Sequence, residues 1–150
     1  GAILRHLLSA QNKPTTVVMT VQKEVAERVT AVPPQMSLLA VSTQLYGTAE
    51  LITTIKAGAF WPRPDVDSAV LRLTLYPNPL LPFAQEEPFF ALVKAGFSQK
   101  RKQLKNNLQQ LGYNQAEVTA VLQAAGLDGR RRAETLSIDE WLAIHQHRTL

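Results

Sequence analysis

Two adjacent aromatic residues enter a proline-rich stretch near the middle of the chain, in the segment Ala59-Phe60-Trp61-Pro62-Arg63-Pro64-Asp65-Val66-Asp67-Ser68. Prolines preset the backbone, so neighbouring side chains are held in place at little entropic cost. Such a loop can present the ring of Phe60 or Trp61 to a flat ligand. The competing interpretation, which composition alone favours, is that both rings plug the end of a β-sheet.

Positive charges cluster at two places in the second half of the chain. Leu104, Leu108 and Leu111 have helical spacing and predict a buried stripe, which leaves the neighbouring cations on the opposite side. Clustered cations beside amide side chains suit phosphate contact, because each neutralised phosphate releases counterions. We therefore treat both clusters as candidate RNA-binding residues, with a plain solvated surface as the alternative. They are Lys100, Arg101, Lys102 and Lys105 in the first cluster and Arg130, Arg131 and Arg132 in the second.

Other kinds of site lack support in the sequence. The seven glycines are scattered, so no phosphate-binding loop is recognisable and no cofactor-binding residue is expected in this chain. The absence of cysteine excludes a disulfide framework and a thiolate metal site. His6, His145 and His147 are expected on the solvated surface, so no metal site is expected.

Composition indicates a soluble globular protein. With 150 residues, 45% hydrophobic and 19% charged, the chain can form one domain or two small ones. The formal net charge of +4 is modest and gains meaning only from the clustering of the cations. No apolar run is long enough to span a membrane and no signal peptide is recognisable, so we expect a cytoplasmic protein without a membrane partner.

The first half of the chain has the alternating pattern of an α/β sheet. A helix is predicted to end near Ser9, and the β-branched run Thr15 to Val21 predicts a buried strand. A valine stripe from Val21 to Val32 predicts a helix that Pro33-Pro34 stops, and a further helix is expected between Ser37 and Gly47. Period-two patterns predict strands at 48–55 and 67–75, which completes the second half of a layered sheet.

The second half reads as a small helical domain. Four prolines between Tyr76 and Pro88 favour an extended connector, so the predicted domains are 1–76 and 89–150 with a linker at 77–88. Helices are predicted at 89–96, 98–111, 115–125 and 138–147, with Gly112 and Gly126 as stops. Asn114 with Glu117, and Ser137 with Glu140, have capping-box spacing at the starts of the last two helices.

Four strings of residues resemble the small-subunit (16S-type) rRNA adenine-N6,N6-dimethyltransferase family. They cover nearly the whole chain in the right order: residues 21–29, the aromatic loop continuing to Leu73, residues 97–108 and residues 132–137. In that family a glycine-rich S-adenosylmethionine loop and an Asn-Leu-Pro-Tyr motif come earlier in the chain. The resemblance therefore implies the C-terminal half of a Rossmann-like α/β methyltransferase sheet followed by a small all-α domain.

The resemblance also implies a function. Family members transfer methyl groups from S-adenosylmethionine to the N6 amines of two adjacent adenosines in small-subunit rRNA during ribosome biogenesis. Phe60 is the one residue carried over to the catalytic site, where it would stack on the flipped adenine. The helical domain would dock on the rRNA of a pre-ribosomal particle by shape and phosphate contacts. This chain alone would bind no cofactor and would be inactive.

Two alternatives remain open at this stage. One is a large-subunit rRNA adenine methyltransferase of the antibiotic-resistance type, and the other is a non-catalytic RNA-binding or ribosome-assembly module. Half of a parallel sheet would also leave an unpaired strand edge and uncovered apolar faces, so we expect the chain to self-associate.

Overall fold

The computed structural model describes residues 14–148, which divide into two compact units. The sheet unit comprises residues 14–30 and 43–80, and the helical unit comprises residues 31–42 and 81–148. The sheet unit contains β1 (Thr16–Gln22), α2 (Lys23–Val29), β2 (Gly47–Ile55), the short 3₁₀ helix η1 (Ala57–Ala59) and β3 (Ser68–Leu75). The helical unit contains α4 (Phe83–Gly96), α5 (Leu104–Leu108), η2 (Gln109–Leu111), α6 (Gln115–Ala124), η3 (Ala133–Thr135) and α7 (Ile138–His147). Helix α3 (Leu38–Gln44) leads the chain from the helical unit back to the sheet unit.

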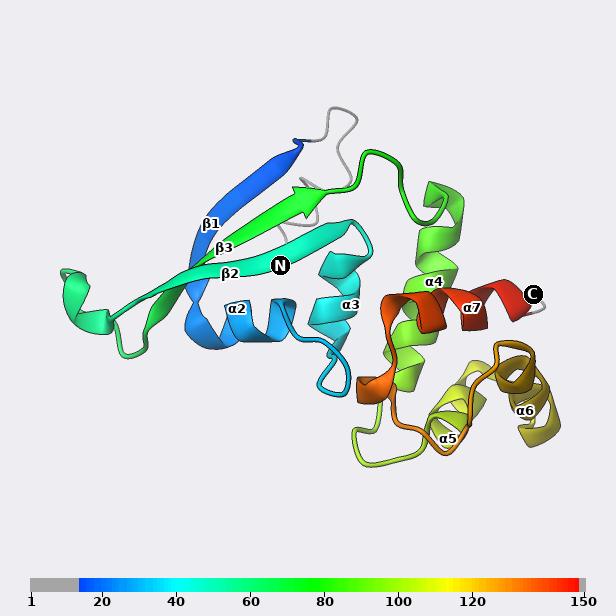
Figure 1. Cartoon of the computed structure of the whole chain (residues 1–150). Helices are drawn as coiled ribbons and strands as arrows, with labels where there is room; N and C mark the ends of the chain where they lie inside the picture. The colour runs from blue at the N-terminus through cyan, green and yellow to red at the C-terminus, as the bar shows by residue number, and fades with distance from the viewer. Residues whose placement is uncertain (1–13, 149–150) are drawn as a thin grey trace. The chain divides into compact units, whose positions relative to one another are not determined.

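The sheet has the order β1-β3-β2, and both strand pairs are antiparallel (Figure 1). The central strand β3 shows the predicted period-two pattern, with Ala69, Leu71 and Leu73 buried. Helix α2 contacts all three strands and buries Ala26 and Val29. The core of this unit therefore lies between α2 and one apolar face of the sheet.

Two details of the predicted sheet and one of the predicted helix that follows β1 were wrong. The described strands include no parallel pair, because β2 and β3 form a hairpin and β1 joins the other side of β3. Strand β1 is an edge strand with alternate residues exposed rather than a buried strand, and Val18 is 62% exposed. Helix α2 ends at Val29, and the last valine of the predicted stripe, Val32, is exposed.

The helical unit is built around large buried side chains from four of its helices. Trp141 of α7 lies against Gly96 at the end of α4, where an added Cβ would collide with the indole ring. Both predicted capping boxes are present, at the starts of α6 and α7. The predicted stops Gly112 and Gly126 both have positive φ, at 91° and 72°. The core is formed by Phe89, Leu92, Leu104, Leu122, Leu136, Trp141 and Ile144.

The predicted linker was wrong in its second half. Helix α4 begins at Phe83 directly after Pro82 and contains Pro88, so only residues 77–82 form a connector. Residues 31–42, predicted within the catalytic domain, belong to the helical unit. Met36 explains this, since its side chain is buried and its N–H donates to the Glu134 carbonyl at 2.9 Å.

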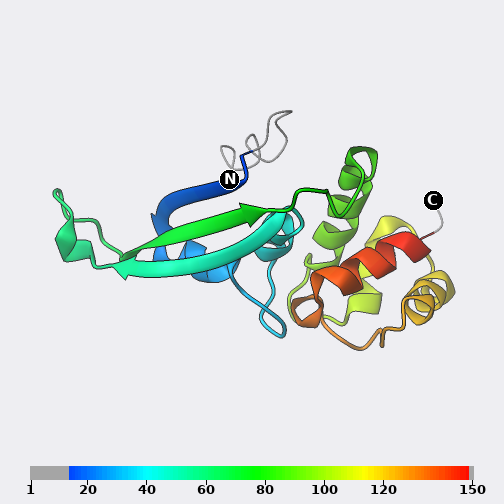
Figure 2. The same cartoon turned by 45° about the horizontal axis from the view of Figure 1, so that its top comes forward.

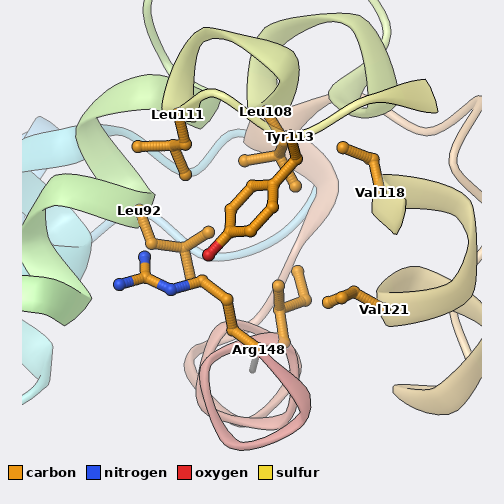
Figure 3. A pocket seen from close by; sticks show the side chains of 8 residues that line it. Leu92, Leu108, Leu111, Tyr113, Val118, Val121 and Arg148 are labelled. Carbon is orange, nitrogen blue, oxygen red and sulfur yellow. The ribbon is translucent and has the colours of Figure 1, made fainter. Parts of the chain in front are cut away.

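A small apolar cavity lies inside the helical unit. Leu92, Leu108 and Ile144 line it, and the ring of Tyr113 enters it opposite Arg148 (Figure 3). Apart from Arg148 and the Tyr113 hydroxyl the lining carries no polar side chain, so the cavity has the character of a packing gap. No helix within residues 14–148 combines the length and the apolar content required to cross a bilayer.

His145 is buried, which corrects the expectation that it lies on the surface. On α7 it follows Trp141 and Ile144 at core spacing, and its ring meets Phe89 edge to face with centroids 5.7 Å apart. Burial lowers the pKa of His145 below its ordinary value of 6.5, and the nearby Arg148 charge lowers the pKa further. Exposed His147 lies on the opposite side of the same helix, and His6 lies outside the described residues.

His145 should make the helical unit less stable as pH falls. Because the folded-state pKa is depressed, the unfolded chain takes up a proton below about pH 6.5 while the folded chain resists it. We predict that the free energy of unfolding decreases between pH 7 and 5.5, and that His145→Gln flattens this slope. Urea unfolding at each pH measures it, with His147→Gln as the control. An unchanged slope in His145→Gln would contradict the assignment.

Candidate nucleic-acid interface

The aromatic loop connects β2 to β3 and extends from the end of that hairpin (Figure 2). Its two ends are joined by Asp67, whose carboxylate accepts hydrogen bonds from the Ala57 N–H at 2.9 Å and from Lys56 Nζ at 3.0 Å. The Asp67 carbonyl in turn accepts from the Lys23 N–H at 2.9 Å. The backbone hydrogen bond from Ala57, followed by the bond from Lys56, lowers the pKa of Asp67. The base of the loop is thus fixed while its tip remains open.

Phe60 and Trp61 do not plug the sheet. Trp61 is 97% exposed and Phe60 is 36% exposed, and both lie beyond η1 in the loop. Composition favoured the interpretation that both rings fill the end of the sheet, because the sequence does not reveal how far the hairpin extends. In a loop that projects from the sheet Trp61 has no core to fill, so the interpretation of a presented ring fits Trp61, whereas Phe60 is only partly exposed.

The first basic cluster lies mostly on a loop rather than on the predicted helix. Helix α4 continues to Gly96 and α5 begins only at Leu104, so Lys100, Arg101 and Lys102 occupy the turn between them. All three are exposed and line an open hollow with Gln99. The predicted helix 98–111 is helical only from Leu104 onward, because the aliphatic stripe begins at Leu104 and no apolar side chain holds residues 98–103 in a helix.

Asn107 holds this turn, and sequence reasoning missed it. Its side chain is 1% exposed, and Nδ2 donates to the Gly96 carbonyl at 2.6 Å and to the Gln99 carbonyl at 3.1 Å. These bonds tie the end of α4 and the entrance of the basic turn to α5. The only signal in the sequence was that Asn107, a residue with a side-chain amide, stands next to Leu108, which is buried.

The start of α5 joins the second basic cluster to the first. The Leu104 N–H donates to the Arg131 carbonyl at 2.8 Å, and the Lys105 N–H donates to the Gly129 carbonyl at 3.2 Å. These bonds take the place of a side-chain cap at Gln103. Lys105 and Arg130 consequently line one hollow, although they are distant in sequence.

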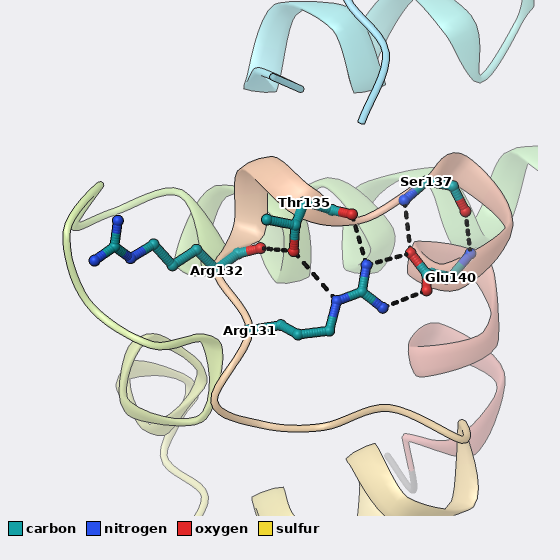
Figure 4. Close-up of polar contacts among 5 residues, drawn as sticks. All are labelled: Arg131, Arg132, Thr135, Ser137 and Glu140. Atoms are coloured by element: carbon teal, nitrogen blue, oxygen red, sulfur yellow. Dashed lines mark hydrogen bonds and ion pairs between the residues drawn. The ribbon is translucent and has the colours of Figure 1, made fainter. Parts of the chain in front are cut away.

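The three consecutive arginines have different surroundings. Arg130 forms a two-pronged ion pair with Asp128, whose pKa its hydrogen bonds lower to about 2. Arg131 points inward and pairs with Glu140, while also donating to the Thr135 carbonyl at 2.6 Å (Figure 4). The Arg132 side chain extends away from this network and forms no ion pair with an acidic side chain among the described residues (Figure 4).

Arg131 therefore has a structural role, which separates it from the other predicted RNA-binding residues. Its hydrogen bonds lower the pKa of Glu140, the same residue that completes the capping box with Ser137. A guanidinium committed to two internal partners is not available to phosphate. Lys100, Arg101, Lys102, Lys105, Arg130 and Arg132 remain as the candidate surface, which we call the basic surface.

Neither a nucleotide cofactor nor a metal has a fitting site in the part of the chain that the structure describes. Among the described glycines, those at 47, 96 and 129 lie close to neighbouring atoms, those at 112 and 126 end helices, and Gly58 stands alone in η1 after β2, so no glycine-rich phosphate-binding turn follows a strand. Within residues 14–148 no three His, Cys, Asp or Glu side chains gather as metal ligands. The S-adenosylmethionine implied by the resemblance does not fit these residues.

Curated proteins with similar sequences are rRNA methyltransferases. The chain is 42% identical over 142 residues to "Ribosomal RNA small subunit methyltransferase A" of Dehalococcoides mccartyi (strain CBDB1), covering 94% of this chain and 49% of the relative. The protein of the same name from Desulfitobacterium hafniense (strain DSM 10664 / DCB-2) is 41% identical over 145 residues, covering 95% and 52%. The chain thus spans about half the length of the curated relatives it matches.

Solved structures share the fold. "23S rRNA methyltransferase ErmE" matches with a TM-score of 0.72 at 28% identity, covering 97% of this chain and 59% of that one. "A dimethyladenosine transferase from Plasmodium falciparum" matches with a TM-score of 0.77 at 21% identity, covering 94% and 60%, which supports the fold alone. The family model described as "Ribosomal RNA adenine dimethylase" matches residues 1–148. The chain belongs to the ribosomal RNA adenine dimethylase family.

Proposed function

We propose that this chain is the rRNA-docking and base-stacking part of an enzyme that dimethylates the N6 amines of two adjacent adenosines in small-subunit rRNA. The observation that carries the proposal is the pairing of an exposed aromatic loop with a separate exposed basic surface in a chain of this family. S-adenosylmethionine would be bound by residues outside this chain, and the chain alone would be inactive. We place the enzyme in the cytoplasm, acting on pre-ribosomal particles.

Phe60 would stack on the target adenine after that base has left its helix. Base stacking on an aromatic ring contributes about 1–3 kcal/mol, which offsets part of the cost of unstacking. The fixed base of the loop supports this role, because Asp67 positions the chain three residues before Phe60 at Ala57. A ring positioned before the RNA arrives loses little entropy on binding.

The basic surface would bind the folded rRNA through its phosphates. A-form grooves offer side chains little sequence to read, so shape and phosphate contacts carry this kind of docking. Lys100, Arg101 and Lys102 form no ion pair within residues 14–148, so their charges are available to phosphates. Arg130 contributes less, since Asp128 already offsets its charge.

The alternative of a large-subunit rRNA methyltransferase is favoured by one observation, the structural likeness to ErmE. The curated relatives at 38–43% identity carry the small-subunit name and support the first proposal. The two proposals can be distinguished by giving a family-length enzyme that carries this sequence either isolated small subunits or large-subunit rRNA. Methylation of the small subunits supports the first proposal, and methylation of the large-subunit rRNA supports the alternative.

We also propose that the chain self-associates through β1. Within the described residues β1 pairs only with β3, so its other edge has unpaired backbone groups. The exposed Val18 adds an apolar side chain to that strand. Light scattering on the free chain detects such association.

Neutralising the basic turn should weaken docking. We predict that Lys100→Gln/Arg101→Gln/Lys102→Gln lowers affinity for small subunits lacking the adenine methylation by roughly 10- to 100-fold at low salt, because about two or three phosphate contacts are lost. The dependence of log K on log salt should become shallower by about two. Filter binding across a salt series measures both quantities.

The matched control removes three positive charges from the sheet unit, at Lys23, Arg28 and Arg72. Its affinity and salt dependence should stay close to those of the unmodified chain. Equal salt dependence in all three proteins would identify the basic surface as a plain solvated face.

Removing the Phe60 ring should impair catalysis more than binding. In a family-length enzyme carrying this sequence, we predict that Phe60→Ala lowers adenine methylation by roughly 5- to 150-fold and leaves rRNA affinity nearly unchanged. Val66→Ala, which removes an exposed apolar side chain from the same loop, serves as the control. Equal activity of Phe60→Ala and the unmodified enzyme would refute the stacking role.

A further inference from the structure

Trp61 is the most exposed large hydrophobic residue among those described. Its indole is 97% exposed, whereas the second tryptophan, Trp141, is fully buried. A tryptophan ring carries a large apolar area, and water is an unfavourable environment for it. The placement of such a ring at the tip of a projecting loop indicates a surface that something else covers.

The loop holds Trp61 in a defined place. Asp67 fastens the loop at Ala57 and Lys56 on one side and at Lys23 on the other. Beyond the ring, Pro62 and Pro64 restrict the backbone. The indole is thus presented from a constrained segment rather than from a free tail.

The backbone at Phe60 separates the two rings. Phe60 is extended, with φ −111° and ψ 149°, and consecutive side chains of an extended chain point to opposite sides. One flat base cannot lie on both rings in that arrangement. If Phe60 holds one base, Trp61 is directed towards a different one.

The charge next to Trp61 suits a nucleic acid. Arg63 is exposed and forms no ion pair within residues 14–148, whereas Lys56 is paired with Asp67. The acidic residue of the tip, Asp65, lines a hollow with Lys23 and Glu24 beside α2. An aromatic ring with a nearby arginine is the combination that binds a single-stranded nucleotide, by stacking on the base and by contact with the phosphate.

We propose that Trp61 is a second stacking residue, which holds the nucleotide next to the adenosine on Phe60 while Arg63 contacts its phosphate. This inference rests on the proposed function and makes it more specific. Because the substrate would contain two adjacent adenosines, the base on Trp61 is the neighbour in the single strand. Trp61 and Phe60 then hold consecutive bases apart.

Tryptophan fluorescence tests this directly, because Trp141 is buried and Trp61 is open to quenchers. The probe is an eight-nucleotide single-stranded RNA with two adjacent adenosines, titrated into the chain. We expect the RNA to quench the emission and to protect it from iodide. Trp61→Phe should lose both signals yet keep its RNA affinity within about threefold, and Trp61→Ala should bind roughly 5- to 150-fold more weakly.

Two results would overturn the inference. One is unchanged emission up to millimolar RNA together with equal RNA affinity of Trp61→Ala. The other is a blue shift that grows with protein concentration in the absence of RNA, which identifies a second copy of the chain as the occupant. Salt-dependent docking of small subunits on the basic surface can persist in either case, so failure at Trp61 is distinguishable from failure of the proposed function.

Discussion

The arrangement of the basic surface depends on the hydrogen bonds that the buried side-chain amide of Asn107 donates. A buried polar group is unfavourable unless it is hydrogen-bonded, and Asn107 Nδ2 donates to the carbonyls of Gly96 and Gln99, whereas its Oδ1 is buried without a hydrogen-bond partner among the described residues. The same short helix receives residues 129–131 through the N–H groups of Leu104 and Lys105. Five residues of α5 therefore connect two cationic segments that lie about 25 residues apart in sequence. Without that connection the two basic clusters would lie on separate loops with no fixed position relative to each other.

The aromatic loop follows a different principle on the other unit. It is carried by the hairpin of β2 and β3, and a single carboxylate at Asp67 closes its base. Because the base of the loop is held by hydrogen bonds, the aromatic rings beyond it are positioned at a surface and not in a cavity. In the proposed function the basic surface of the helical unit would bind phosphates of the folded rRNA, whereas the aromatic loop of the sheet unit would bind bases and, through Arg63, one phosphate of the single strand.

Local features of the fold could be predicted from the sequence, whereas features that depend on distant contacts could not. The capping boxes at Asn114 and Ser137 and the left-handed glycines at 112 and 126 each rest on a few neighbouring residues, and all are present. Residues 31–42 join the helical unit through Met36 and Glu134, a contact between segments about 100 residues apart. The sequence does not distinguish Arg131 from Arg130 and Arg132, because its ion pair with Glu140 is visible only in the fold. The candidate site residues could be proposed from residue type, but the burial of His145 and the exposure of Trp61 could be seen only in the fold.

The positioning of the basic surface by α5 is best tested by rRNA binding of Asn107→Ala, in which every cation of the basic surface is retained. If α5 positions those charges, the affinity for unmethylated small subunits should fall by roughly tenfold, because the turn loses its ordered geometry. Circular dichroism must show that the variant is folded, and Asn106→Ala, at the exposed neighbouring position, should bind normally. A folded Asn107→Ala that binds as tightly as the unmodified chain would contradict the account, because the charges would then act without the helix that positions them.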